Sequence, residues 1–188
     1  MTKKNHRLRG GLAAALLLSS LGLSACSSSE DTPEAAAVPS AQSVAALIAD
    51  ADNLTTVAGA LEKTGLASVF DGKASYTLLA PEDTAFTALG ESGESLTDGS
   101  DNAALAALLK EHMLPGYVTL DDLAAAIDAS DDGSVSMPNL AGEELTFTRE
   151  GEAIMVAAPD GKRVTLAKDA LAGGQSVAIP VDGLLKQT

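Results

Sequence analysis

The stretch Tyr76-Thr77-Leu78-Leu79-Ala80-Pro81-Glu82-Asp83-Thr84-Ala85-Phe86-Thr87-Ala88-Leu89 predicts a strand that turns directly into a helix. Its first five residues form a short, apolar, partly β-branched run, which is typical of a buried strand. Pro81 suits the first turn of a helix, because a first-turn residue needs no backbone donor. Glu82 and Asp83 would then lie in that turn, where negative charge meets the positive end of the helix dipole. Phe86 and Leu89, three residues apart, would return to the core.

The chain before this stretch is predicted to be helical. Apolar residues recur at helical spacing over residues 44–48 and again over 54–61. The pair Asp52-Asn53 could cap the second helix, and Gly65 could end it. Residues 66–70 would add a further short helical turn before the strand.

Two more helices are predicted after the stretch, separated from it by a loop. Residues 90–100 are rich in Gly, Ser and acidic side chains and are expected to form a mobile loop. Asp101 could cap an Ala/Leu helix that runs to about His112. Thr119 and Asp122 resemble a capping box, which predicts a helix through residue 129.

The last third of the sequence changes to a strand pattern. Short alternating runs at 145–148, 153–156, 163–166 and 177–179 are separated by turns at Glu150-Gly151-Glu152 and Asp160-Gly161. These runs predict a β-meander. Helices first and strands later, with one strand among the helices, indicate an α+β domain.

Three segments of the chain, in order, resemble the signature blocks of the fasciclin domain. The first is the stretch quoted above, which is similar to a strand running into an Ala-Pro-Thr-Asn-Glu-Ala-Phe helix start. The second, Leu108-Leu109-Lys110-Glu111-His112-Met113-Leu114-Pro115-Gly116, resembles Leu-Leu-Tyr-His-Val-Val-Pro-Gly, and the third, Val181-Asp182-Gly183-Leu184-Leu185, resembles Ile-Asp-Gly-Val-Leu. The resemblance implies a wedge-shaped β-sandwich flanked by helices.

The resemblance also singles out motif positions with an expected structural role: Ala80, Pro81, Asp83, Thr84, Phe86, His112, Pro115, Gly116, Asp182 and Gly183. Thr84 departs from the acidic residue of the family. Glu111 replaces the tyrosine of the family's tyrosine-histidine pair, which argues against receptor binding of the animal, integrin-dependent kind. By resemblance, His112 is expected to approach the first block, with its imidazole within hydrogen-bond reach of Asp83-Thr84.

Residues 1–25 are predicted to be a lipoprotein signal peptide. A basic start at 3–9 precedes an apolar run at 10–23, which is too short to span a bilayer comfortably. The run ends in Leu23-Ser24-Ala25-Cys26, which resembles the bacterial lipobox, in which the cysteine is acylated. Cys26 is the only cysteine of the chain and lies where this pattern requires it. The alternative is an ordinary signal peptide followed by a chance cysteine.

The predicted anchor and tether place the domain outside the cytoplasm. Acyl chains on Cys26 would hold the protein at a membrane surface, because stable anchoring needs more than one buried chain and the lipoproteins that this pattern resembles carry three. Ser27 follows the cysteine and, by resemblance to Gram-negative sorting rules, favours the outer membrane. Residues 26–41 are rich in Ser, Ala, Glu and Pro, as in a disordered tether. Residues 42–188 would then form a single fasciclin domain.

Charge and composition limit the possible partners and chemistry. The part after Cys26 holds all 26 acidic residues and eight of the 12 basic ones, a formal charge of −18. Such a charge repels phosphate backbones, so nucleic acid is not an expected partner. The chain after its leader has one histidine, His112, too few for a metal cluster or a relayed nucleophile. The acidic segments 98–102 and 128–133 lack the spacing of a calcium loop and are interpreted as solvated turns.

Three hypotheses for the function follow. The first is a non-enzymatic, membrane-anchored lipoprotein for cell-surface adhesion or extracellular matrix association, with an unidentified surface or matrix protein or polysaccharide as partner. The second is a periplasm-facing module for envelope binding or maintenance. The third, remote one is a hydrolase that uses His112 as a base beside Asp83. No cofactor and no metal is predicted, and the chain is not expected to be an enzyme.

Overall fold

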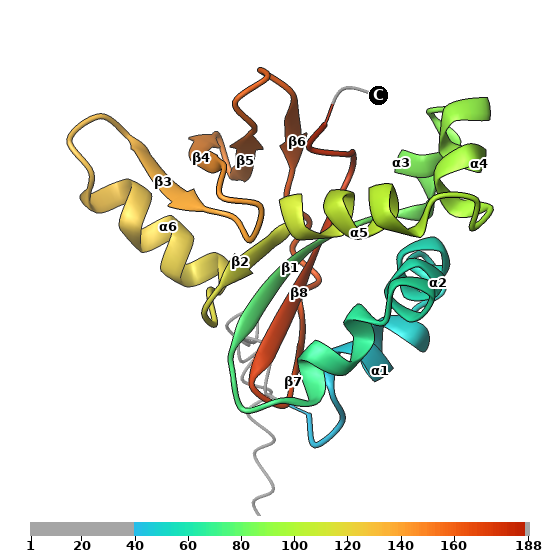
Figure 1. Cartoon of the computed structure of the whole chain (residues 1–188). Helices are drawn as coiled ribbons and strands as arrows, with labels where there is room; N and C mark the ends of the chain where they lie inside the picture. Colours follow the sequence, from blue (N-terminus) through green and yellow to red (C-terminus); the bar gives the residue numbers. More distant parts are fainter. Residues whose placement is uncertain (1–39, 187–188) are drawn as a thin grey trace, which may run out of the picture. The chain divides into compact units, whose positions relative to one another are not determined.

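The computed structural model describes residues 40–186 (Figure 1). The predicted signal peptide, Cys26 and the predicted tether up to residue 39 lie outside the described residues. The helices are α1 (Val44–Ala49), α2 (Thr55–Thr64), the 3-10 helix η1 (Leu66–Asp71), α3 (Asp83–Thr87), α4 (Glu91–Thr97), α5 (Asn102–Glu111) and α6 (Leu120–Ala129). The strands are β1 (Tyr76–Pro81), β2 (Met113–Pro115), β3 (Ser134–Pro138), β4 (Glu144–Glu150), β5 (Ala153–Ala157), β6 (Arg163–Thr165), β7 (Leu171–Gly173) and β8 (Ser176–Val181). The predicted α+β class is confirmed.

The strands form two four-stranded sheets. Sheet A has the order β2-β1-β8-β7, and sheet B has the order β3-β4-β5-β6. In sheet A, β1 and β8 are parallel, with Thr77 opposite Val177 and Pro81 opposite Val181. In sheet B, every neighbouring pair is antiparallel. The predicted meander is therefore confirmed for β4 to β6, and an additional strand, β3, pairs with β4. The predicted strand at 177–179 is not its continuation, because β8 lies beside β1 in the other sheet.

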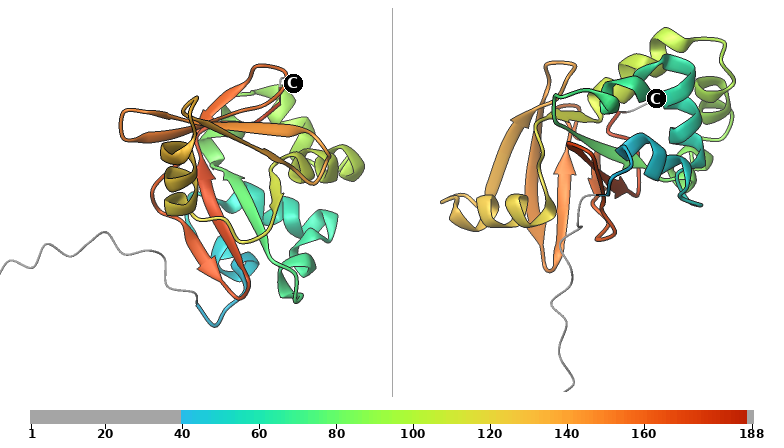
Figure 2. Two further views of the ribbon diagram at one scale, coloured as in Figure 1. Left: turned by 90° about the vertical axis from the view of Figure 1, so that its left-hand side faces the viewer. Right: turned by 90° about the horizontal axis from the view of Figure 1, so that it is seen from below.

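Sheet A is the middle layer, with helices on one face and sheet B on the other (Figures 1 and 2). Along β1, Leu78 and Ala80 pack with α1, α2 and α5, whereas Leu79 packs with sheet B and α6. Along β8, Ala178 belongs to the helical side and Ile179 to the other. A strand buried on both faces has no polar side to show in its sequence, which explains the continuous apolar runs of β1 and β8.

Sheet B buries only one face. Leu145 and Phe147 of β4, and Ile154 and Val156 of β5, are buried, while their neighbours along each strand are at least partly exposed. This alternation is what a strand with one solvated face requires, and it made these strands readable from the sequence. The sheets meet where Leu166 pairs with Val181.

The predicted strand-to-helix junction is confirmed, but the strand ends one residue later and the helix begins two residues later than predicted. Pro81 is the last residue of β1, not a residue of the first helical turn, and Glu82 is the N-cap of α3. Asp83 is the first helical residue. Pro81 lies opposite Val181 at the end of the strand, and its missing N–H is not needed there because the N–H of Glu82 donates to the carbonyl of Val181.

The predicted mobile loop at 90–100 is wrong, because residues 91–97 form α4. Its composition has low helix propensity, but tertiary contacts override that preference. Leu96 packs against the helical core, and Lys63 donates to the carbonyl of Thr97. Gly93 allows a close approach to α3, since a Cβ there would lie 2.2 Å from the carbonyl oxygen of Phe86. The glycine that suggested flexibility is therefore a packing residue.

Most predicted caps are confirmed. Asp101 caps α5 through a bond from the Ala104 N–H, and α6 begins with a full capping box of Thr119 and Asp122. Gly65 ends α2 with φ of 73°. At the N-terminal edge, Ser40 pairs with Gly173 of β7, so the described chain contacts sheet A slightly before the predicted domain start. Within residues 40–186, no helix is both long and apolar enough to cross a bilayer.

We expect Phe86→Ala to lower the free energy of unfolding by about 3–5 kcal/mol, because the ring is buried in the helical core and would leave a cavity. Chemical denaturation followed by circular dichroism measures this change. The matched control is Leu140→Ala, whose side chain is 37% exposed and should cost below about 0.5 kcal/mol. A loss of under about 1 kcal/mol for Phe86→Ala would contradict the assigned core.

Candidate functional site

The carboxylate of Asp83, in the first signature segment, caps a neighbouring helix instead of its own. One oxygen accepts a bond of 2.7 Å from the Thr56 N–H, and the other accepts bonds from the hydroxyl and N–H of Thr55 at 2.7 and 3.3 Å. The N-cap of α2 is Leu54, which supplies no side-chain bond of its own. The predicted cap Asp52-Asn53 is thus wrong, since Asp83 reaches across from α3. This contact joins the starts of α2 and α3.

These bonds also set the protonation of Asp83. Partial burial raises the pKa of the carboxyl, but the bonds from Thr56 and Thr55 outweigh it and hold the pKa below its ordinary value. Asp83 is therefore a capping carboxylate that stays ionised near neutral pH. Thr84, its neighbour in the motif, is exposed.

His112, in the second signature segment, is fully buried and bonded through both ring nitrogens. Its Nδ1 lies 2.8 Å from the carbonyl oxygen of Leu108, and its Nε2 lies 3.0 Å from the N–H of Leu185. A carbonyl only accepts and a backbone N–H only donates, so Nδ1 carries the proton and Nε2 does not. The ring is thus neutral and joins the second signature segment to the third.

The predicted contact of His112 with Asp83-Thr84 is wrong. The carboxylate of Asp83 accepts hydrogen bonds from the start of α2, and the imidazole of His112 accepts one from Leu185 in the third signature segment. Burial lowers the pKa of His112 to about 4, although the bond to Leu108 acts in the other direction. A buried, neutral ring with both nitrogens engaged cannot reach a substrate, so the geometry gives no support to a His112 hydrolase.

Glu111, which stands where the family has tyrosine, is also buried. Its Oε1 lies 2.5 Å from the ammonium of Lys186, and that bond raises the pKa of Lys186. Among the described residues, its Oε2 has no hydrogen-bond partner. The carbonyl of Glu111 accepts from the Asn139 side chain at 2.9 Å. Glu111 and His112 together therefore fasten residues 185 and 186 to the end of α5.

The remaining motif residues form turns and close contacts. Asp182 accepts from the Thr165 N–H at 2.7 Å, and a Cβ on Gly183 would lie 2.8 Å from Cγ1 of Val164. Pro115 ends β2, and Gly116 adopts φ of 97° there. Ala80 is fully buried in β1. The motif positions thus hold the fold at separate joints and do not gather into one site.

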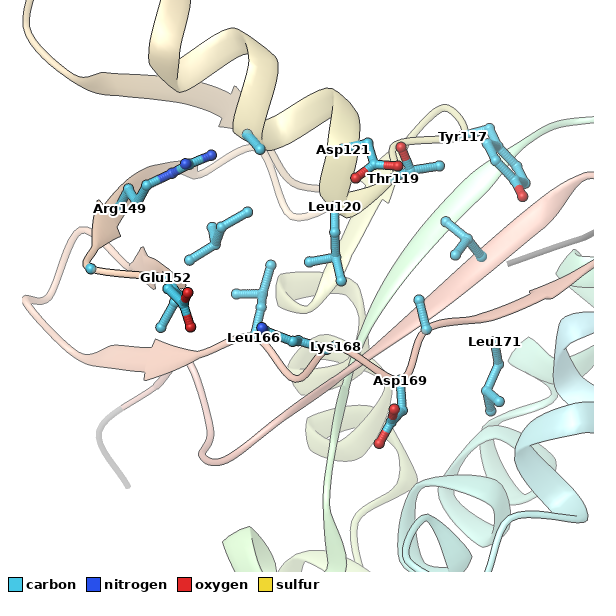
Figure 3. Close-up of a pocket in the computed structure, with 16 residues that line it drawn as sticks. Tyr117, Thr119, Leu120, Asp121, Arg149, Glu152, Leu166, Lys168, Asp169 and Leu171 are labelled. Carbon is cyan, nitrogen blue, oxygen red and sulfur yellow. The ribbon is translucent and has the colours of Figure 1, made fainter. Parts of the chain in front are cut away.

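A groove of about 860 Å³ opens between the two sheets and α6 (Figure 3). This volume is typical of ligand sites. The groove is lined by Tyr117, Thr119, Leu120, Asp121, Ala124, Arg149, Gly151, Glu152, Ala153, Ile154, Leu166, Lys168, Asp169, Ala170, Leu171 and Val177. The sheets meet at Val181 and separate toward Val177, so the expected wedge form is confirmed and the groove occupies its open side.

None of the lining residues was singled out as a site residue from the sequence. They come from four separate segments: the start of α6, the β4–β5 turn, the β6–β7 loop and the β7–β8 hairpin. Each segment contributes a few ordinary apolar or charged residues, and only the fold brings them together. Tyr117 is one of only two tyrosines in the sequence, but no sequence pattern places it beside the strands that line the groove.

The acidic segments considered for calcium use their carboxylates locally. Asp98 accepts from the Ser100 N–H, and Asp132 accepts from the Ser130 hydroxyl and the Ser134 N–H. Between residues 40 and 186, no three His, Cys, Asp or Glu side chains converge in a group that could hold a metal. These segments are turns closed by their own side chains.

Comparison with known proteins gives a family. The fasciclin domain family matches residues 52–186, so the chain belongs to the fasciclin domain family. A solved structure with a similar fold is a FAS1 domain pair from the insect cell adhesion molecule fasciclin I, with a TM-score of 0.67 and 14% identity. The match covers 80% of this chain and 52% of that chain, so this chain spans about half of the two-domain structure. No curated protein sequence matches significantly.

We expect Asp83→Ala to cost about 1–2 kcal/mol of stability, because the N-terminus of α2 would lose its capping carboxylate. Urea denaturation measures the loss. Thr84→Ala is the matched control: its exposed side chain makes no described hydrogen bond, and its change should stay within about 0.5 kcal/mol. Equal effects of the two substitutions would contradict the cap.

We expect His112 to make stability depend on pH between about 6.5 and about 4. The unfolded chain protonates this histidine near pH 6.5, whereas the folded protein does so only near pH 4. The contribution of the neutral His112 ring to the free energy of unfolding is complete above pH 6.5 and is lost as the pH falls to about 4. This loss amounts to about 3 kcal/mol. Denaturation midpoints across this range, compared between the wild type and His112→Gln, isolate the effect.

The comparison with His112→Gln cancels the background from the many carboxylates, which both proteins share. At neutral pH, His112→Ala should cost about 1–3 kcal/mol, since the N–H of Leu185 and the carbonyl of Leu108 lose their partner. Identical pH profiles for the wild type and His112→Gln would show that the ring is not held neutral.

Proposed function

We propose that this chain is a non-enzymatic adhesion module, held at a membrane by a lipid on Cys26, that acts in cell-surface adhesion or extracellular matrix association. The observation that carries the proposal is the fasciclin domain match over residues 52–186. The fold is shared with a FAS1 domain pair of an insect cell adhesion molecule, which supports a binding role. The partner is an unidentified surface or matrix protein or polysaccharide.

The chemistry of the motif residues supports a binding role over catalysis. His112 is neutral, buried and bonded on both nitrogens, and Asp83 caps α2 with both oxygens. Side chains engaged in this way stabilise the fold and are not available to a substrate. The groove between the sheets is open to solvent and lined by apolar and charged groups, so it is the contact surface that we favour.

The anchor is supported by the sequence around Cys26, which lies outside the described residues. Acylation there would tether the domain through residues 27–41, and Ser27 favours the outer membrane. Display on the periplasmic side remains the alternative. Protease treatment of intact cells distinguishes the two, because only an outward-facing domain is cleaved before lysis.

Adhesion is tested with cells that lack this chain, complemented by the wild type or left without it. We expect binding of the complemented cells to matrix from the same culture to exceed that of the deletion strain. Beads coated with the full chain should bind the same matrix. Equal binding with and without the chain in all growth phases would refute the adhesive function.

We expect Cys26→Ala to release the protein from the membrane fraction, because the acyl chains that hold it would be lost. Fractionation followed by immunoblotting measures the release, and circular dichroism checks that the domain remains folded. Ser27→Ala is the matched control and should remain in the membrane fraction. Membrane retention of Cys26→Ala would refute the lipoprotein assignment.

A further inference from the structure

The groove between the sheets combines an apolar floor with a charged rim. Three buried apolar residues of the lining, Ile154, Leu166 and Val177, form what we call the floor, and Leu120 and Leu171 also line the groove. Figure 3 labels Leu166 of the floor together with Leu120 and Leu171. The floor residues are at most 7% exposed, while Leu120 and Leu171 are partly exposed. An occupant would therefore contact apolar side chains from β5, β7, β8 and α6. Apolar groups on the occupant are needed to match this surface.

The rim of the groove has an excess of uncompensated negative charge. Asp121 lies in the first turn of α6, Glu152 in the β4–β5 turn and Asp169 in the β6–β7 loop. Among the described residues, none of these three carboxylates has a hydrogen-bond or ion-pair partner. Two cations also line the groove, but Arg149 lies 3.4 Å from Asp128, which leaves Lys168 against three carboxylates.

We propose that this groove binds a protein segment that carries apolar side chains interspersed with lysine or arginine. The apolar side chains would lie on the floor formed by Ile154, Leu166 and Val177, and the basic ones would reach the carboxylates of the rim. Because these carboxylates come from different segments, they would hold a basic segment at several points along the groove. The −18 charge of the chain after Cys26 would attract such a partner over a distance.

Charge argues against the other possible occupants. The chain's own predicted tether, residues 27–39, has three acidic residues and no basic one, so the rim repels it. A second copy of the chain carries the same strongly negative charge. Anionic lipid head groups are repelled for the same reason. A basic, partly apolar segment is the occupant whose chemistry is complementary to both the floor and the rim.

This inference rests on the proposed adhesive function, since it names the class of partner that the domain would hold. Rim charges in protein interfaces act mainly on the association rate and on its dependence on salt. Binding should therefore weaken as salt is raised, while the apolar floor should make a purely basic peptide a poor ligand.

The test uses three labelled peptides and the full chain in fluorescence anisotropy. The first peptide alternates lysine and valine, the second alternates lysine and serine, and the third alternates glutamate and valine. We expect the lysine-valine peptide to bind at least about tenfold more tightly than either of the others at low salt, and to weaken in about 0.5 M salt. Equal binding of the lysine-serine peptide would overturn the role of the floor, and equal binding of the glutamate-valine peptide would overturn the role of the rim.

Two triple variants separate the rim from the general negative charge of the protein. Asp121→Asn with Glu152→Gln and Asp169→Asn should weaken binding of the lysine-valine peptide about tenfold. The matched control removes three exposed carboxylates outside the groove, Asp71→Asn with Asp131→Asn and Glu144→Gln, and should change binding less than about twofold. Equal losses in the two triple variants would show attraction to the overall charge only and would refute the site.

A filled groove provides an independent check. Ala170→Trp places a large ring in the groove and should abolish binding, with Ala124→Trp as a second filling variant if the first is unfolded by circular dichroism. Peptide binding that survives in the folded variants would refute the groove. Cell adhesion that persists with a filled groove, without peptide binding, would refute this inference and leave the adhesive function standing. The proposed function requires only that the deletion strain loses adhesion, and that result does not depend on the groove.

Discussion

The parallel pairing of β1 with β8 is the constraint on which the rest of the structure depends. Thr77 lies opposite Val177, so the two strands at the centre of sheet A are contributed by segments a hundred residues apart. Both faces of the pair are buried, one by the helices and one by sheet B. The chain before β1 supplies α1 and α2 of the helical layer, and the chain between the two strands adds α5 to that layer and then forms sheet B, so that neither face of the pair is exposed. Long-range pairing of this kind is reached late and is costly in chain entropy, so both ends need fastening.

Polar groups of the signature segments provide that fastening. Asp83 follows β1 and ties α3 to the start of α2, while His112 follows α5 and ties it to Leu185, just beyond β8. Asp182 pairs with Thr165 at the edge of sheet B. Each contact satisfies a backbone N–H at or just beyond the end of an element, where an unpaired donor would be costly. The motif is therefore a set of joints around one pair of strands, and its residues carry structural roles even where their chemistry would suit catalysis.

The sequence was sufficient for the class of fold and for most elements, because these depend on local patterns. Alternation revealed β4 and β5, and capping residues located α5 and α6. It failed where a distant partner decides the outcome. The helix α4 forms on packing that its glycines and serines concealed, and α2 is capped by Asp83 from 27 residues further along the chain. The partner of His112 was misplaced for the same reason, since a family pattern gives the order of segments and not the contacts between them.

The groove follows from the same topology and not from any motif. Sheet B is joined to sheet A beside Val181, and the two sheets diverge toward Val177, where α6 and the β6–β7 loop flank the gap. The core closes the joined end with aliphatic side chains, so the same apolar layer continues as the floor of the open end. The first turn of α6, the β4–β5 turn and the β6–β7 loop form the rim, and in an acidic chain such surface segments bring carboxylates. An apolar floor under an anionic rim is thus what a wedge of two sheets produces in a sequence of this charge, and the chemistry of a suitable partner is set by the fold and composition together.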